Sequence, residues 1–161
     1  MRFRRRQHLP DEVRASLPLE PGERVIAAAR DRGDSWLVAT ERALLAGDRR
    51  TPWTDVVHAR WDDQQLLLTV DLAPGAGPSL RLALTDPGRL PETVHERVMD
   101  SIVLSRRVPV PGGAVRVVAR RGDGSPETLW QVVPDAGTDL ADPAVRDEVE
   151  ASLSVLRAEL G

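Results

Sequence analysis

The segment SWLVATERALLAG, residues 35–47, decides the fold prediction, because its letters suit either a buried helix or a hairpin. Two short apolar runs, WLVA and ALLA, flank the charged pair Glu41-Arg42. A glycine lies near each end, and too few residues separate the two glycines for a stable amphipathic helix. We therefore predict a hairpin whose strands are 35–40 and 43–47.

The alternation of apolar and polar residues continues on both sides of this hairpin. In LLLTVDL, for example, Leu66, Leu68 and Val70 share one face of a strand, and the residues between them point to the other face. Glycine, proline and aspartate separate the alternating segments and mark the turns. The predicted strands are 23–30, 35–40, 43–47, 53–61, 66–72, 80–84, 114–120 and 128–133.

Two segments have a helical period instead. Apolar residues recur every four positions from Leu90 to Ile102, which predicts a helix over about 91–104. The pair Asp142-Pro143 is a typical helix start, because Asp caps the first turn and Pro suits its first position. The apolar stripe that follows predicts a final helix over 143–160.

The composition of the 161-residue chain excludes several classes of function. The chain contains no cysteine, which excludes thiolate metal sites and thiol redox chemistry. It also contains no lysine, since all 22 basic residues are arginine, and this excludes a P-loop and a Schiff-base site. The formal net charge of −3 gives no general attraction to nucleic acid or anionic membrane.

The targeting features predict a cytoplasmic protein. No apolar run approaches the length of a membrane span. The N-terminal sequence MRFRRRQHLPDEV is basic, but no apolar core of a secretory signal follows it. Export is therefore not expected.

The order of the predicted elements resembles a pleckstrin-homology-like (PH-like) fold that lacks its last strand. WLVATERALLAG resembles the second hairpin of bacterial PH-like and GRAM-like domains, where an apolar strand ends in Thr, an acidic residue and Arg. TPWTDVVHARWDDQQLLLTV looks like the next pair of strands in those domains. The resemblance covers about residues 20–104, and the whole chain is similar to a family of small uncharacterised proteins of GC-rich bacteria. It implies a PH-like fold and a function in binding, without catalytic residues.

The densest charge cluster is N-terminal and consists of Arg2, Arg4, Arg5 and Arg6. These arginines are the candidate binding residues, because guanidinium groups bind the phosphates of anionic lipid or nucleic acid. The alternative for this segment is a solvated tail that binds nothing.

No catalytic residue, metal or cofactor is expected. His58 lies on the outward face of a predicted strand and His95 on the polar face of a predicted helix, so neither has neighbouring ligands for a metal. The adjacent carboxylates Asp62 and Asp63 occupy a predicted turn, where their side chains diverge. Both pairs are interpreted as solvated residues.

These patterns together predict an α+β protein. Its antiparallel PH-like sheet, or partly closed barrel, has about eight strands, and the helices at about 91–104 and 143–160 pack against it. Residues 1–22 are interpreted as an Arg-rich arm and a Pro-containing linker, and residues 23–161 as a single domain.

The predicted function is that of a non-enzymatic intracellular interaction module whose partner is a protein. One alternative is weak peripheral binding of anionic membrane through the Arg arm. The other is an enzyme whose carboxylate site has no recognisable motif. Nucleic acid is not expected as a partner. The sequence leaves open the oligomeric state and whether the final helix packs on its own sheet or on another protein.

Overall fold

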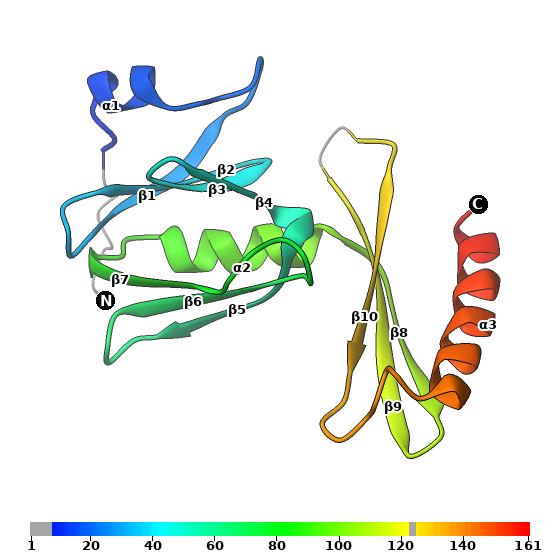
Figure 1. Ribbon diagram of the computed structural model, residues 1–161. Helices are drawn as coiled ribbons and strands as arrows, with labels where there is room; N and C mark the ends of the chain where they lie inside the picture. Colours follow the sequence, from blue (N-terminus) through cyan, green and yellow to red (C-terminus); the bar gives the residue numbers. More distant parts are fainter. Residues whose placement is uncertain (1–7, 123–124) are drawn as a thin grey trace. The chain divides into compact units, whose positions relative to one another are not determined.

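The computed structural model describes residues 8–122 and 125–161, and within them the chain forms ten strands and three α-helices (Figure 1). The strands form two open antiparallel sheets, one of seven strands and one of three. The sequence predicts a single domain over 23–161, whereas the chain divides into two compact units. Of the described residues, unit 1 contains those up to Ser101 together with Gly122 and Ser125, and unit 2 comprises Ile102–Arg121 and Pro126–Gly161.

Unit 1 has all its strands in one sheet, in the order β4-β3-β2-β1-β7-β6-β5. The first and last strands of the unit are therefore neighbours, and α2 follows the last strand and lies across the sheet (Figure 1). The elements of unit 1 are α1 Asp11–Ser16, β1 Val25–Asp31, β2 Trp36–Thr40, β3 Ala43–Ala46, β4 Arg49–Pro52, a 3-10 helix at Trp53–Asp55, β5 Val56–Asp62, β6 Leu67–Leu72, β7 Leu80–Asp86 and α2 Leu90–Asp100.

The segment 35–47 forms the predicted hairpin, with β2 paired antiparallel to β3. At its turn, the Thr40 hydroxyl accepts hydrogen bonds from the backbone N–H groups of Arg42 (3.1 Å) and Ala43 (2.9 Å). A side-chain oxygen that accepts from the backbone two or three residues later stabilises a tight turn. The Thr that precedes the charged pair therefore has a structural role.

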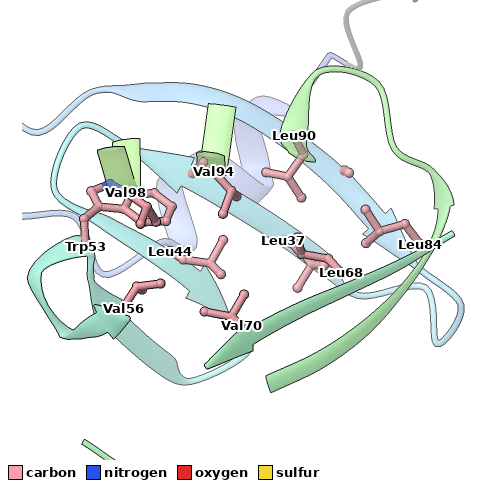
Figure 2. Close-up of a cluster of buried hydrophobic side chains, with 12 residues drawn as sticks. Leu37, Leu44, Trp53, Val56, Leu68, Val70, Leu84, Leu90, Val94 and Val98 are labelled. Carbon is pink, nitrogen blue, oxygen red and sulfur yellow. The ribbon is translucent and has the colours of Figure 1, made fainter. Parts of the chain in front are cut away.

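The main core of unit 1 lies between the sheet and α2 (Figure 2). Leu90, Val94 and Val98 form the apolar stripe of α2, as their four-residue spacing predicts. Trp53 lies at one end of this core, and its indole N–H donates a 2.8 Å hydrogen bond to the Thr40 carbonyl. The strand residues buried most completely in this core are Ala29, Leu37, Ala39, Leu44, Val56, Leu68, Val70 and Leu84.

A second, smaller core covers part of the other face of the sheet. Leu9 is 3% exposed and packs with residues of β1, β2 and β3, and the apolar side chains of Val13, Leu17 and Leu19 pack around it. The segment 1–22 is interpreted from the sequence as an arm and a linker. Its described part from Leu9 to Leu19 packs on the sheet of unit 1.

Unit 2 is a three-stranded meander with one helix. Its elements are β8 Ile102–Val110, β9 Gly113–Arg121, β10 Thr128–Pro134 and α3 Pro143–Leu160, and its sheet order is β10-β9-β8. The Asp142 side chain caps α3 by accepting a 2.9 Å hydrogen bond from the Ala144 N–H. Val145, Val149 and Leu156 of α3 pack on the valines of the unit's own sheet. The predicted helix 143–160 is thus confirmed.

The predicted helix 91–104 extends too far at its C-terminal end. The helix ends at Asp100, and the Ser101 hydroxyl donates a 2.7 Å hydrogen bond to the Val98 carbonyl. Ile102 then begins β8 and pairs with Arg120. Ile102 continues the four-residue apolar spacing by coincidence, and the β-branched pair Ile102-Val103 favours a strand.

The sequence pattern also misses two strands, so that the count is ten and not about eight. β4 has only four residues, and its two arginines and C-terminal proline hide any alternation. β8 contains Pro109, which a strand tolerates here because β8 is at the edge of its sheet. The short helix α1 brings the number of helices to three, where two are predicted.

Truncating a core side chain of unit 1 is expected to lower its stability strongly. Leu68 is 1% exposed, so Leu68→Ala leaves a cavity that costs about 3 kcal/mol of unfolding free energy. Urea denaturation followed by tryptophan fluorescence in a Trp130→Phe background measures unit 1 alone, because the other tryptophans lie in that unit. Met99→Ala is the control, since Met99 is 52% exposed and should change stability by less than about 0.5 kcal/mol. Equal effects of the two changes would contradict the core.

Candidate functional site

The binding and metal-ligand candidates considered in the sequence do not form a site within the described part of the structure. Arg2, Arg4, Arg5 and Arg6 lie outside the described residues. His58 in β5 and His95 in α2 are both exposed. In the described parts of the chain, no group of three or more His, Asp or Glu residues could hold a metal ion. No helix in those parts is both long and apolar enough to cross a membrane.

A groove of about 710 Å³ lies along the start of β1 in unit 1. Its lining includes five consecutive residues, Arg24 to Ala28, of which the last four belong to β1. Leu9 and Arg14 contribute from the N-terminal segment and α1. The opposite side comes from α2 and the residue before it.

One face of α2 and its N-terminal flank line the groove. The lining residues of this face lie three or four positions apart along the helix, which places them on neighbouring turns. They are Arg89, Thr93, Glu96 and Arg97. Thr93 is buried at the base of this face, whereas Arg89 and Glu96 are exposed. The helix thus presents charged side chains to the groove and apolar ones to the core.

The groove is basic although the chain as a whole is acidic. Its lining contains four arginines and one histidine but only two carboxylates. These residues are Arg14, Arg24, Arg89, Arg97 and His8, and Glu41 and Glu96. The Arg24 guanidinium is 82% exposed and lies 3.3 Å from a Glu41 carboxylate oxygen. An ion pair with such an exposed cation contributes little stability, so Arg24 can exchange this partner for a ligand at small cost.

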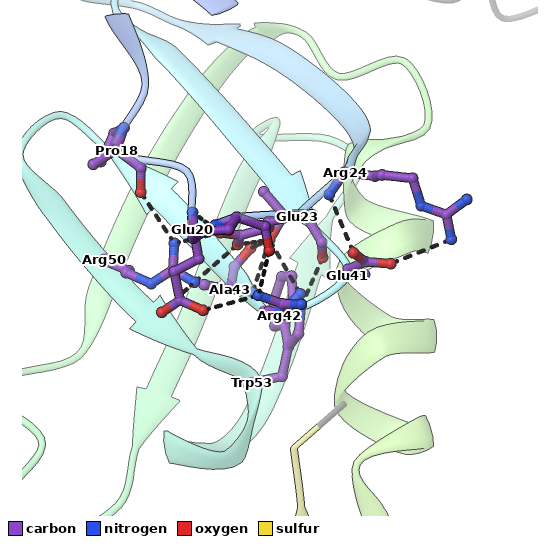
Figure 3. Close-up of polar contacts among 11 residues, drawn as sticks. Pro18, Glu20, Glu23, Arg24, Glu41, Arg42, Ala43, Arg50 and Trp53 are labelled. Atoms are coloured by element: carbon purple, nitrogen blue, oxygen red, sulfur yellow. Dashed lines mark hydrogen bonds and ion pairs between the residues drawn. The ribbon is translucent and has the colours of Figure 1, made fainter. Parts of the chain in front are cut away.

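A network of buried polar groups lies beside the groove and centres on Glu23 (Figure 3). The Glu23 side chain is fully buried, and its two oxygens accept hydrogen bonds from the Arg50 guanidinium at 3.0 and 2.9 Å. The Thr40 hydroxyl and the Glu20 backbone N–H also donate to this carboxylate, at 2.5 and 2.8 Å. A buried carboxylate is tolerated because it has these four donors.

The network changes the protonation behaviour of Glu23. Burial by itself raises the pKa of the Glu23 carboxyl, because it disfavours the charged form. The hydrogen bonds from Arg50, Thr40 and the Glu20 N–H, with the charge of Arg50, outweigh burial and hold the pKa below its ordinary value. Glu23 is therefore ionised at neutral pH.

The network also fixes the entrance of the groove. Arg24 follows Glu23 in the chain, and its backbone N–H donates to a Glu41 carboxylate oxygen at 3.2 Å. The Glu41 N–H donates in return to the Arg24 carbonyl at 3.2 Å. With Glu23 anchored to β4 and Arg24 bonded to Glu41, the first residues of β1 are held in place beside the groove.

A second hollow, of about 450 Å³, lies between β5 and α2 in unit 1. The half-buried Trp61 lines it, and its indole N–H donates to Asp63 at 3.3 Å. His95 and Glu92 of α2 lie on its other side. This hollow contains charges of both signs, and it has no buried polar group that would select a ligand.

Unit 2 contains one buried charge. Arg120 in β9 is 2% exposed, and its Nε–H donates a 2.9 Å hydrogen bond to the Gln131 side-chain oxygen on β10. Burial lowers the pKa of the Arg120 guanidinium. The pair joins neighbouring strands of one sheet, so its role within the unit is structural.

Comparisons with family models, with curated proteins and with solved structures found no match to this chain. The geometry of the groove therefore carries the functional argument.

Replacing Glu23 is expected to make stability less dependent on acid pH. The pKa of Glu23 in the folded protein is lowered, so the ionised carboxylate stabilises unit 1 at pH values above the ordinary Glu pKa. This stabilisation is lost as the pH falls through the pKa that Glu23 has in the folded protein. Glu23→Gln should cost about 3 kcal/mol of unfolding free energy at pH 7, since it leaves Arg50 without its buried partner. The difference from wild type should shrink below about pH 4.

Urea denaturation at several pH values, in the Trp130→Phe background, measures this difference. The matched control is Glu12→Gln, because Glu12 is an exposed residue of α1 with no ion pair among the described residues. A deficit for Glu23→Gln that stays constant from pH 7 to about pH 3 would contradict the assigned protonation state.

Proposed function

We propose that this protein is a cytoplasmic, non-enzymatic interaction module built on a PH-like unit, and that it binds a protein partner in the groove beside β1. The observation that carries the proposal is the groove itself, where four arginines lie around the first residues of β1. Strand backbone and guanidinium groups both form hydrogen bonds with polypeptide ligands.

The order of elements in unit 1 supports the PH-like part of the proposal. A PH-like fold has seven strands before its helix, and the sequence pattern supplies only six. β4 provides the strand that the pattern lacks, so seven antiparallel strands precede α2. The sheet also brings the first strand next to the seventh.

The chemistry of the groove favours binding over catalysis. An enzyme with a carboxylate site would gather several acidic groups in one cleft, as general acid and base. The groove instead has four arginines and two glutamates. Among the described residues, three of the arginines have carboxylate partners: Arg24 pairs with Glu41, Arg97 with Asp100 at 2.8 Å and Arg89 with Glu92 at 3.9 Å. Such a surface recognises negative charge.

Neutralising two groove arginines is expected to abolish partner binding. The groove variant is Arg14→Gln/Arg24→Gln, and both side chains are exposed, so the fold should persist. The control variant is Arg81→Gln/Arg146→Gln, which removes the same charge from exposed positions outside the groove. The measurement is affinity capture with full-length protein from the cell of origin, followed by mass spectrometry.

Proteins captured by wild type and by the control variant, but not by the groove variant, would support the proposal. Equal capture by all three forms would contradict it, because binding would then be independent of the groove. Recovery of anionic lipid in place of protein, with the same dependence on Arg14 and Arg24, would favour the membrane alternative.

A further inference from the structure

We infer that the groove binds an extended, acidic segment of a partner protein, which adds to unit 1 as a strand beside β1. This inference rests on the proposed function and specifies its ligand and binding mode. The pairing of β1 differs on the two sides of the strand.

On one side, β1 pairs with β2 along nearly its whole length, from Val25 to Arg30. On the other side it pairs with β7 only through Arg30 and Asp31. Of the strands that the structure describes, none pairs with Val25–Ala29 on this second side. The first five residues of β1 therefore have no paired strand on this side, and the groove follows four of them, Val25 to Ala28. Ala28 and Ala29 are only 6% and 0% exposed, so this edge is most accessible at Val25–Ala27.

The direction of the backbone groups follows from the hairpin at the end of β1. The Asp31 N–H donates to the Ser35 carbonyl at 2.9 Å, so the backbone of Asp31 faces β2. Successive residues of a strand direct their N–H and C=O groups to opposite sides, which means that Ala27 and Ala29 face β2. Ala28 therefore directs its N–H and C=O into the groove.

The walls of the groove suit an added strand. Ala28 packs in the core on the α1 side of the sheet and Ala29 in the core on the α2 side, so the two layers flank the strand edge. The four residues of β1 that line the groove span about 13 Å, which matches a short extended peptide. Ile26 lines the groove and is 45% exposed, so it offers an apolar contact to one side chain of that peptide.

The charge of the lining selects an acidic occupant. Arginines come from both walls, with Arg14 on the α1 side and Arg97 on the α2 side, and alternate side chains of an added strand point to opposite walls. Glu41 and Glu96 of the lining reduce this preference. Asp100 and Glu92 reduce it further, because they pair with Arg97 and Arg89, and an acidic ligand must compete with these exposed carboxylates for the two guanidinium groups. The sequence that precedes His8 contains four arginines, so its charge does not complement the groove.

A lipid headgroup or a free phosphate would use the arginines alone. The open backbone edge and the exposed Ile26 would then have no role, because phosphate does not extend along a strand. A peptide with alternating acidic and apolar side chains uses the arginines, the strand edge and Ile26. The observations therefore favour the peptide.

The test uses the full-length protein and a fluorescein-labelled peptide of about seven residues that alternates Glu and Val. Fluorescence anisotropy should show saturable binding that weakens as salt increases. A peptide with Gln in place of Glu should bind at least about tenfold more weakly. A third peptide with N-methyl groups on two consecutive central residues keeps its charge but loses one N–H donor on each edge, and it should also bind at least about tenfold more weakly.

A second measurement locates the strand without any substitution. Amide hydrogen exchange should slow by about tenfold or more at Ala28 when the Glu-Val peptide is saturating, because the Ala28 N–H gains an acceptor. Ala27 is the internal control, since its N–H faces β2 and should be unaffected by the peptide.

Several outcomes would overturn the inference. One is equal binding of the N-methylated and unmodified peptides, which would show an attraction of charge without strand addition. A second is the absence of peptide binding up to about 1 mM. A third is binding of anionic vesicles in preference to the peptide. In each case the capture experiment with the Arg14 and Arg24 variant remains a separate test of the proposed function. Failure of this inference is therefore distinguishable from failure of the proposed function.

Discussion

The buried contact between the Glu23 carboxylate and the Arg50 guanidinium organises the first half of unit 1. Its two hydrogen bonds, at 3.0 and 2.9 Å, connect the residues before β1 to β4 at the far edge of the same sheet. Thr40 joins the network from the end of β2. A buried, ionised carboxylate needs these hydrogen-bond donors. Moving the start of β1 away from the hairpin would separate Glu23 from them and cause a large loss of stability.

The groove is a consequence of this constraint. The N-terminal end of β1 is held to β2, whereas β7 pairs only with the other end of β1. The gap that results is bordered by residues of α1 and α2, which pack on opposite faces of the sheet. The fold thus creates an open strand edge between two walls, and Arg14 and Arg97 make those walls basic. An edge of this kind favours addition of a further strand.

Local patterns predict the hairpin, the core faces of the strands and the helix over 143–160, because each depends on spacing within one segment. The end of α2 is not predictable in this way, since Ile102 satisfies both the helical stripe and the pairing of β8 with β9. The groove is also hidden in the sequence. Its arginines come from three segments, α1, the residue before β1, and α2 with its N-terminal flank, and their proximity depends on the tertiary fold. Glu23 carries no local signal either, because its burial depends on Arg50, which lies 27 residues away.

The central claim is that the open edge of β1 receives a polypeptide strand. Isotope-filtered nuclear Overhauser measurements test it most directly, with labelled full-length protein and the unlabelled peptide of alternating Glu and Val. The account predicts contacts from peptide backbone protons to the backbone protons of Ala28 and its neighbours, as between adjacent strands. Contacts confined to the arginine side chains, with none to the backbone of β1, would contradict it.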